Sequence, residues 1–234
     1  MALYLTKPIN IPIGASQQEA LRRISKSLNV KPSQIDDWRL HKRSVDARDK
    51  SAVRFVCSYV VQTDAIPSNA AAYRPQVNVL NSVPKLATDK RCVVVGAGPA
   101  GLFAALYLVK CGLDVTVIER GSDIAQREGK VNGFFGGGQL DENCNVQFGL
   151  GGAGAFSDGK LTTGTSSPLI YTVFDELVRF GAPRDILTSA LPHIGTDKLK
   201  PLVANMRDRI ISHGGKFLFD TAVTDFSVSD GAVT

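Results

Sequence analysis

The six residues from Gly96 to Gly101, GAGPAG, have the G-x-G-x-x-G spacing that can bind the diphosphate of a dinucleotide. Gly96 would permit a tight turn, Gly98 would let a diphosphate touch the backbone, and Gly101 would let a helix lie close to a strand. Backbone N–H groups at the N-terminus of that helix would meet the phosphate oxygens. The hexapeptide alone is weak evidence, because its meaning depends on the elements around it.

Those elements have the required order. The run RCVVV predicts a buried strand, PAGLFAALYLVKCG predicts a helix with Leu102, Leu106 and Val109 on one face, and LDVTVI predicts a second buried strand. Glu119 ends this strand, 18 residues after Gly101, where an acid hydrogen-bonds ribose hydroxyls and disfavours a 2′-phosphate. The βαβ unit therefore favours FAD or NAD over NADP.

A second glycine-rich segment distinguishes these two cofactors. Four glycines lie between Phe148 and Phe156, and Ser157-Asp158-Gly159-Lys160 follow. The segment is either a floppy loop or backbone that passes very close to something flat or charged. An NAD site does not need such a block, whereas the ring and ribityl chain of a flavin need backbone at van der Waals distance. The sequence therefore favours FAD.

Four motifs occur in order along the chain: VVVGAGPAGLFAAL, VIERG, NVQFGLGGAGAFSDGKLTT and PHIGTDKL. With them, the chain resembles the uncharacterised FAD-dependent dehydrogenases, also called NAD(FAD)-utilising dehydrogenases, of the glutathione reductase-like superfamily. The resemblance implies an oxidoreductase with one FAD, its adenine end at the βαβ unit and its isoalloxazine ring near the second glycine block. It leaves the catalytic residues and the small-molecule substrate unidentified, and NAD(P)H is a candidate reductant.

The resemblance also assigns cofactor-binding residues. Lys160 would place positive charge at the N1/O2 edge of the flavin and raise its reduction potential. Val223, expected on the strand KFLFDTAVTDF, would meet the adenine through its backbone. The residues expected to bind the cofactor are Gly96, Gly98, Pro99, Ala100, Gly101, Glu119, Arg120, Arg127, Gly151, Gly152, Gly154, Ser157, Asp158, Lys160 and Val223.

Chains of this family continue well beyond the final segment DFSVSDGAVT, which predicts a β-hairpin. We therefore expect a further C-terminal region to complete the cofactor and substrate sites. An alternative function follows, in which the chain is a truncated, non-catalytic remnant that binds FAD weakly or binds a partner.

Charge and glycine divide the chain into two modules. Residues 1–90 carry a net charge of +7 and one glycine, whereas residues 91–234 carry −2 and 21 glycines. We predict a small basic α+β domain over residues 1–65, a linker over 66–90, and the N-terminal part of a Rossmann-like α/β FAD-binding domain over 91–234. In the first domain, Ser16 and Glu19 form a capping-box pattern before a helix.

The basic domain raises a third possibility, RNA or partner binding. Nucleic acid is the less expected ligand, because aromatic residues do not alternate with its cations in the sequence. The four cysteines and three histidines lack metal-ligand spacing, so no metal site is expected. His193 is expected to anchor a turn. Without a secretory signal or a membrane-length apolar run, the chain is expected to be soluble and cytoplasmic.

Overall fold

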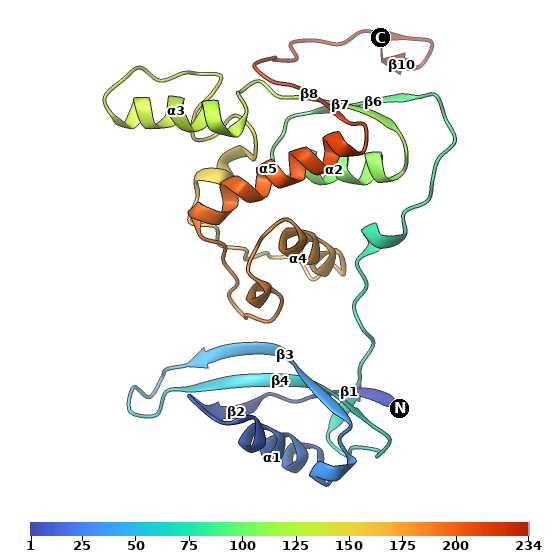
Figure 1. Ribbon diagram of the computed structural model, residues 1–234, viewed down its shortest axis with the longest axis vertical. Coiled ribbons are helices and arrows are strands. Elements are labelled where there is room, and N and C mark those ends of the chain that lie inside the picture. Colours follow the sequence, from blue (N-terminus) through green and yellow to red (C-terminus); the bar gives the residue numbers. More distant parts are fainter. Residues whose placement is uncertain (234) are drawn as a thin grey trace. The chain divides into compact units, whose positions relative to one another are not determined.

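The computed structural model describes residues 1–233, and its contacts divide the chain into two compact units (Figure 1). The first unit comprises Met1–Val77, Leu161–Phe174 and Pro183–Pro192. The second comprises Asn78–Lys160, Asp175–Ala182 and the residues from His193 onward. The domains predicted over residues 1–65 and 91–234 stay a prediction, because Leu161–Phe174 and Pro183–Pro192 group with the first unit by their contacts.

The first unit is an antiparallel sheet around strand β4 (Arg54–Thr63). Strands β1 (Ala2–Thr6) and β2 (Ile9–Pro12) pair with successive stretches of β4, while β3 (Asp37–Asp46) pairs with the same β4 residues from the other edge. The short strand β5 (Ala70–Ala72) pairs with β1. The sheet therefore uses residues from nearly the whole N-terminal third of the chain.

Helix α1 (Gln17–Leu28) packs on this sheet. Ile24 and Leu28 are fully buried against Cys57, Tyr59 and Val61, which alternate along β4 and so share one face. The hydroxyl of Ser16 accepts the Glu19 N–H at 3.1 Å, so the predicted N-cap is confirmed. The Glu19 carboxylate binds Arg23 instead of completing a capping box.

The second unit has a parallel sheet of β6 (Arg91–Val95), β7 (Asp114–Ile118) and β8 (Lys216–Leu218), with β7 in the centre. Helices α2 (Pro99–Lys110) and α5 (Thr196–Ser212) lie side by side beneath the strands (Figure 1). Leu102, Leu106 and Val109 of α2 are buried as predicted, and Met206 and Ile210 of α5 are buried too. This confirms the βαβ unit and the α/β architecture.

Two further helices were not predicted: α3 (Ile124–Phe135) follows β7, and α4 (Leu169–Arg179) follows the second glycine block. The chain also forms 3-10 helices at Pro32–Gln34, Val79–Ser82, Gly152–Phe156 and Arg184–Leu187. The terminal hairpin is present as β9 (Val228–Ser229) and β10 (Ala232–Val233).

The segment expected to be a linker, residues 66–90, carries ordered structure. It contains β5, and its Asn78 side chain donates hydrogen bonds to Asp175 and Glu176 at 2.8 and 2.6 Å. Strand β3 was not predicted, yet nine of its ten residues pair with β4, and the register shifts between Leu40 and Lys42. The many charged residues of β3 hid the strand in the sequence. They are compatible with a strand, because pairing uses the backbone hydrogen-bonding groups while the charged side chains stay exposed.

Candidate cofactor site

The turn between β6 and α2 needs glycine at two positions. Gly96 has a φ of +94°, in the left-handed region that favours glycine. A Cβ on Gly101 would overlap the carbonyl oxygen of Gly96, so any side chain there would push the helix away from the turn. The structure therefore supports the two roles that the spacing assigned to these residues.

The N-terminus of α2 is open to solvent. Gly98 is the N-cap residue and no side chain caps the helix, while Pro99 occupies the first helical turn. Pro99 and Ala100 are both exposed. The first N–H groups of a helix have no partner within the helix, so this end has free donors and a partial positive charge. An anion such as a diphosphate fits this chemistry.

Glu119 lies at the end of β7, is only 5% exposed, and is held by three backbone donors. Its Oε2 accepts the Ala97 N–H at 2.7 Å, and its Oε1 accepts the N–H groups of Gly121 and Gly149, each at 2.9 Å. A carboxylate offers about four acceptor positions. One position therefore remains for a ligand hydroxyl, and Glu119 already joins the first glycine turn to the second glycine block.

The second glycine block packs directly on the first turn. The N–H of Gly151 donates to the Ala97 carbonyl at 2.8 Å. A Cβ on Gly152 would lie 3.2 Å from the Cα of Gly98, and one on Gly151 would lie 3.1 Å from Val203. The space beside these two glycines is thus filled by the chain itself, whereas a flavin was expected there. Contact between this block and a flavin stays a prediction.

Arg127, on α3, is fully buried and holds the start of this block. Its Nε donates to the Asn145 carbonyl at 2.9 Å, and its Nη1 donates to the carbonyls of Gly149 and Leu150 at 3.3 and 2.7 Å. Burial lowers the pKa of Arg127 from its ordinary value, while Cys144 and Glu119 nearby act in the opposite direction. Its Nη2 has no hydrogen-bond partner within residues 1–233. A buried donor of this kind fits an additional anionic or carbonyl oxygen.

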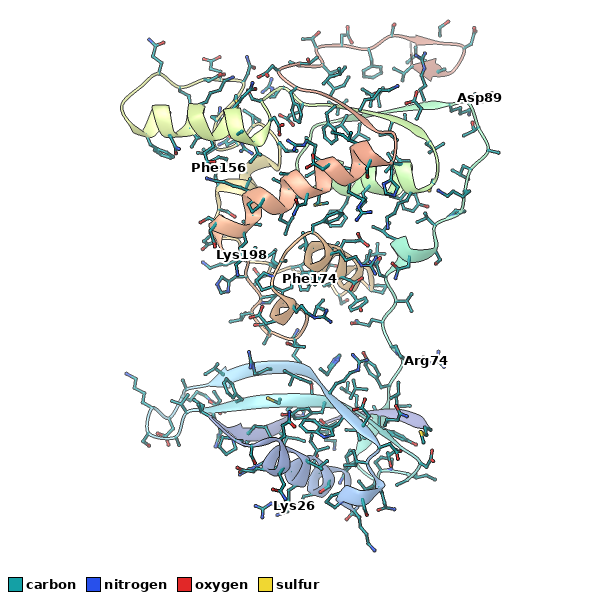
Figure 2. All side chains as sticks on the ribbon, viewed as in Figure 1. Lys26, Arg74, Asp89, Phe156, Phe174 and Lys198 are labelled. Carbon is teal, nitrogen blue, oxygen red and sulfur yellow. The ribbon has the colours of Figure 1, made fainter. Side chains whose placement is uncertain are left out.

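The two phenylalanines that flank the block each contact cations. The guanidinium of Arg120 lies 4.7 Å from the ring centre of Phe148. Phe156 is contacted by Arg127 at 4.7 Å and by the ammonium of Lys200 on α5 at 4.9 Å. Figure 2 shows Phe156 beside the N-terminal half of α5. Cation–π contacts therefore hold both ends of the block, which argues against a floppy loop.

Beyond Phe156 the predicted site residues form a short, polar turn. The Ser157 hydroxyl donates to the Gly154 carbonyl at 2.9 Å and accepts the Gly159 N–H at 3.1 Å. Lys160 and Asp158 form an exposed ion pair with an Nζ–Oδ2 distance of 2.8 Å. This pairing lowers the pKa of Asp158 and raises the pKa of Lys160.

Val223 lies outside the strand on which it was expected. Strand β8 ends at Leu218, and Val223 is 41% exposed in the segment that follows. That segment starts beside Glu119, because the Thr221 N–H donates to the Glu119 carbonyl at 3.0 Å. The prediction that Val223 lies on a strand was therefore wrong, since only three residues of the run KFLFDTAVTDF pair with β7.

The residues that join the two glycine segments were not predicted from the sequence. Gly121 and Gly149 lie back to back: a Cβ on Gly121 would come within 2.6 Å of the Gly149 nitrogen. Lys200 was missed as well, because it lies far from Phe156 in the sequence. The glycine in Glu119-Arg120-Gly121 was the available signal for the first contact. No group of residues suited to a metal ion occurs within residues 1–233.

Two family models match parts of this chain. Residues 91–180 match a family model described as FAD dependent oxidoreductase, and residues 7–62 match one described as a domain of unknown function. An uncharacterized protein of Clostridium beijerinckii is 37% identical over 95% of this chain, and the chain spans 43% of that relative's length. The Lysine-specific histone demethylase 1 homolog 3 of Arabidopsis thaliana is 33% identical over 49% of this chain and 7% of its own.

Among solved structures, Thermovibrio ammonificans THI4 aligns with 62% of this chain and 44% of its own, at 14% identity and a TM-score of 0.37. None of the helices within residues 1–233 has the length and apolar character to cross a membrane.

Proposed function

We propose that this chain, whose residues 91–180 match the FAD dependent oxidoreductase family model, binds one FAD at the β6–α2 turn and serves in a two-electron oxidation of a small molecule. The observation that carries the proposal is the exposed, uncapped N-terminus of α2, which directly follows the Gly96–Gly101 turn and lies beside Glu119. Helix donors would hold the diphosphate, and Glu119 would hold a ribose hydroxyl.

The residues around the β6–α2 turn would each contact the cofactor or leave space for it. Gly98, Pro99 and Ala100 present backbone without bulky side chains, so phosphate oxygens can approach the first N–H groups. The unpartnered Nη2 of Arg127 would donate to a further cofactor oxygen. Glu119 would disfavour a 2′-phosphate by like-charge repulsion. When bound, the flavin would supply the electron-accepting chemistry.

The turn after the second glycine block would face the flavin. Lys160 would stabilise negative charge on the reduced ring, and such charge raises the reduction potential. We include NAD(P)H as a candidate electron donor and an unidentified small molecule as the substrate. Because the chain spans less than half of its Clostridium relative, the activity and substrate are proposed for the protein that contains this chain.

The proposal is tested by titrating the purified chain with FAD and recording flavin absorbance and fluorescence. Gly98→Val adds a branched side chain where the diphosphate would touch the backbone, and Glu119→Ala removes the proposed ribose partner. Gly129→Ala is the matched control, because nothing lies within 4 Å of a Cβ at this helical position.

We expect saturable binding to the wild type and to Gly129→Ala, and at least about tenfold weaker binding to the other two variants, the loss caused by one strong polar contact. A folded chain that does not bind FAD would overturn the proposal and favour a non-catalytic role.

A further inference from the structure

Two segments that are distant in the sequence meet just beyond the second glycine block. Lys160 and His193 form an antiparallel β-bridge. The Ile194 N–H donates to the Gly159 carbonyl at 2.8 Å, and the Leu161 N–H donates to the Pro192 carbonyl at 2.9 Å. These two bonds lie on either side of the bridge, so Lys160 and His193 are a non-hydrogen-bonded pair. Side chains approach each other most closely in pairs of that kind.

Gly159 makes this approach possible. It has a φ of +71°, and a Cβ at this position would overlap the carbonyl oxygen of Ile194. Ile194 is fully buried, so the bridge is anchored in the core of the second unit. The bridge therefore fixes the backbones of Lys160 and His193 although both side chains are exposed.

Three ionisable side chains gather at this bridge. Lys160 and His193 lie directly opposite one another, and Asp158 contacts the Lys160 ammonium. Lys160 carries a positive charge, and His193 can donate a hydrogen bond from a ring nitrogen. The Asp158 carboxylate neutralises part of the Lys160 charge. All three residues are exposed to solvent.

We propose that Lys160 and His193 form an anion-binding pair on the substrate side of the flavin, which would hold a carboxylate or another small oxyanion of the substrate. This inference rests on the proposed FAD function, because the turn that leads from the second glycine block into the bridge is proposed to face the flavin. Asp158 competes with the anion for the Lys160 ammonium. Removing Asp158 should therefore strengthen anion binding, and removing either partner of the pair should weaken it.

Sulfite is the probe for this test, applied to the FAD-loaded full chain. Its sulfur lone pair forms one bond to N5 of the oxidised flavin, no group leaves, and the added negative charge spreads over the ring. Loss of the flavin's visible absorbance reports this addition directly, without any substrate. Cations near the ring stabilise the added charge, so the affinity for sulfite measures their presence.

The variants are Lys160→Met, His193→Gln and Asp158→Asn. The control is Lys198→Met, because Lys198 is an exposed lysine in the first turn of α5 (Figure 2). We expect sulfite to bind roughly fivefold or more weakly to Lys160→Met, as for the loss of one charge about 4 Å away in water. His193→Gln should weaken binding less, Asp158→Asn should strengthen it, and Lys198→Met should leave it unchanged.

Several results would overturn the inference. If FAD binds but sulfite does not react, or if its affinity is the same in Lys160→Met and His193→Gln as in the wild type, the pair does not bind anions beside the flavin. An equal loss in Lys198→Met would show a general charge effect instead of a site. If FAD itself fails to bind, the proposed function fails and the inference fails with it. Equal circular dichroism spectra confirm that all variants are folded.

Discussion

The two glycine-rich segments of the second unit look alike in composition but use glycine for different reasons. In Gly96–Gly101, glycine shapes a turn that leaves the N-terminus of α2 uncapped and exposed. In the block from Gly149 to Gly154, glycine makes room for other parts of the chain, namely Arg127, Val203 and the first turn itself. The first segment offers donors to a ligand, and the second braces the first.

This difference shows why the spacing of the first glycine motif predicts its contacts, whereas the spacing of the second does not. The first depends on neighbours in the sequence, so a fixed spacing describes it. The second depends on partners that lie 22 or more residues away, such as Arg127 and Glu119. Substitutions that remove contacts of one segment, or of both, separate the two roles.

The largest effect is expected for Gly101→Ala. Its Cβ would overlap the backbone oxygen of Gly96, which cannot move without disturbing β6 and α2. We expect a loss of about 4 kcal/mol or more in the free energy of unfolding, as for the most damaging single substitutions. Urea denaturation followed by circular dichroism measures it. In Gly129→Ala, which meets no atom, stability should rise slightly; equal behaviour of the two variants would refute the close-approach argument.

The next largest loss of stability is expected for Arg127→Met. It leaves the carbonyls of Asn145, Gly149 and Leu150 without their donor in a buried setting. A loss of about 3 kcal/mol is expected, because each unsatisfied buried group costs about 1–3 kcal/mol. Arg209→Met, on the exposed side of α5, is the control and should stay within about 0.5 kcal/mol of the wild type. The same denaturation experiment compares them, and a small effect at Arg127 would mean that the block is braced by other contacts.

Glu119→Gln tests the connection between the two segments. The amide keeps one acceptor oxygen but turns its NH₂ group toward backbone N–H donors from Ala97 or Gly121 and Gly149. We expect a loss of about 2 kcal/mol in stability, the cost of one buried group without a partner. The exposed Glu142→Gln should have no such effect. Faster hydrogen exchange at Gly149 in Glu119→Gln would locate the damage; unchanged exchange there would contradict the connection.

The smallest effects are expected for the flanking aromatic residues. Phe156→Leu removes the contacts with Arg127 and Lys200 and should cost about 1 kcal/mol. Phe148→Leu removes only the contact with the exposed Arg120 and should cost about 0.5 kcal/mol. Phe226→Leu, at a 68% exposed position, serves as the reference. If Phe148→Leu proves more damaging than Phe156→Leu in thermal unfolding, the assignment of the stronger anchor to Phe156 is wrong.

The sequence predicted local features well and long-range partners poorly. Ser16 at the start of α1 and the buried face of α2 follow from capping and periodicity, both of which are local. Strand β3 was missed because its charged residues obscure the alternation that identifies a strand. The three donors that hold Glu119 come from separate segments, and only the folded chain brings them together.

The most direct test of the central claim is hydrogen exchange of the full chain with and without FAD. The claim is that the open N-terminus of α2 and the second glycine block form one cofactor site. FAD should slow exchange in peptides covering residues 98–102 and 149–157, and leave the α1 peptide of residues 17–28 unchanged. Bound FAD that protects neither of the first two peptides, or protects α1 instead, would contradict the account.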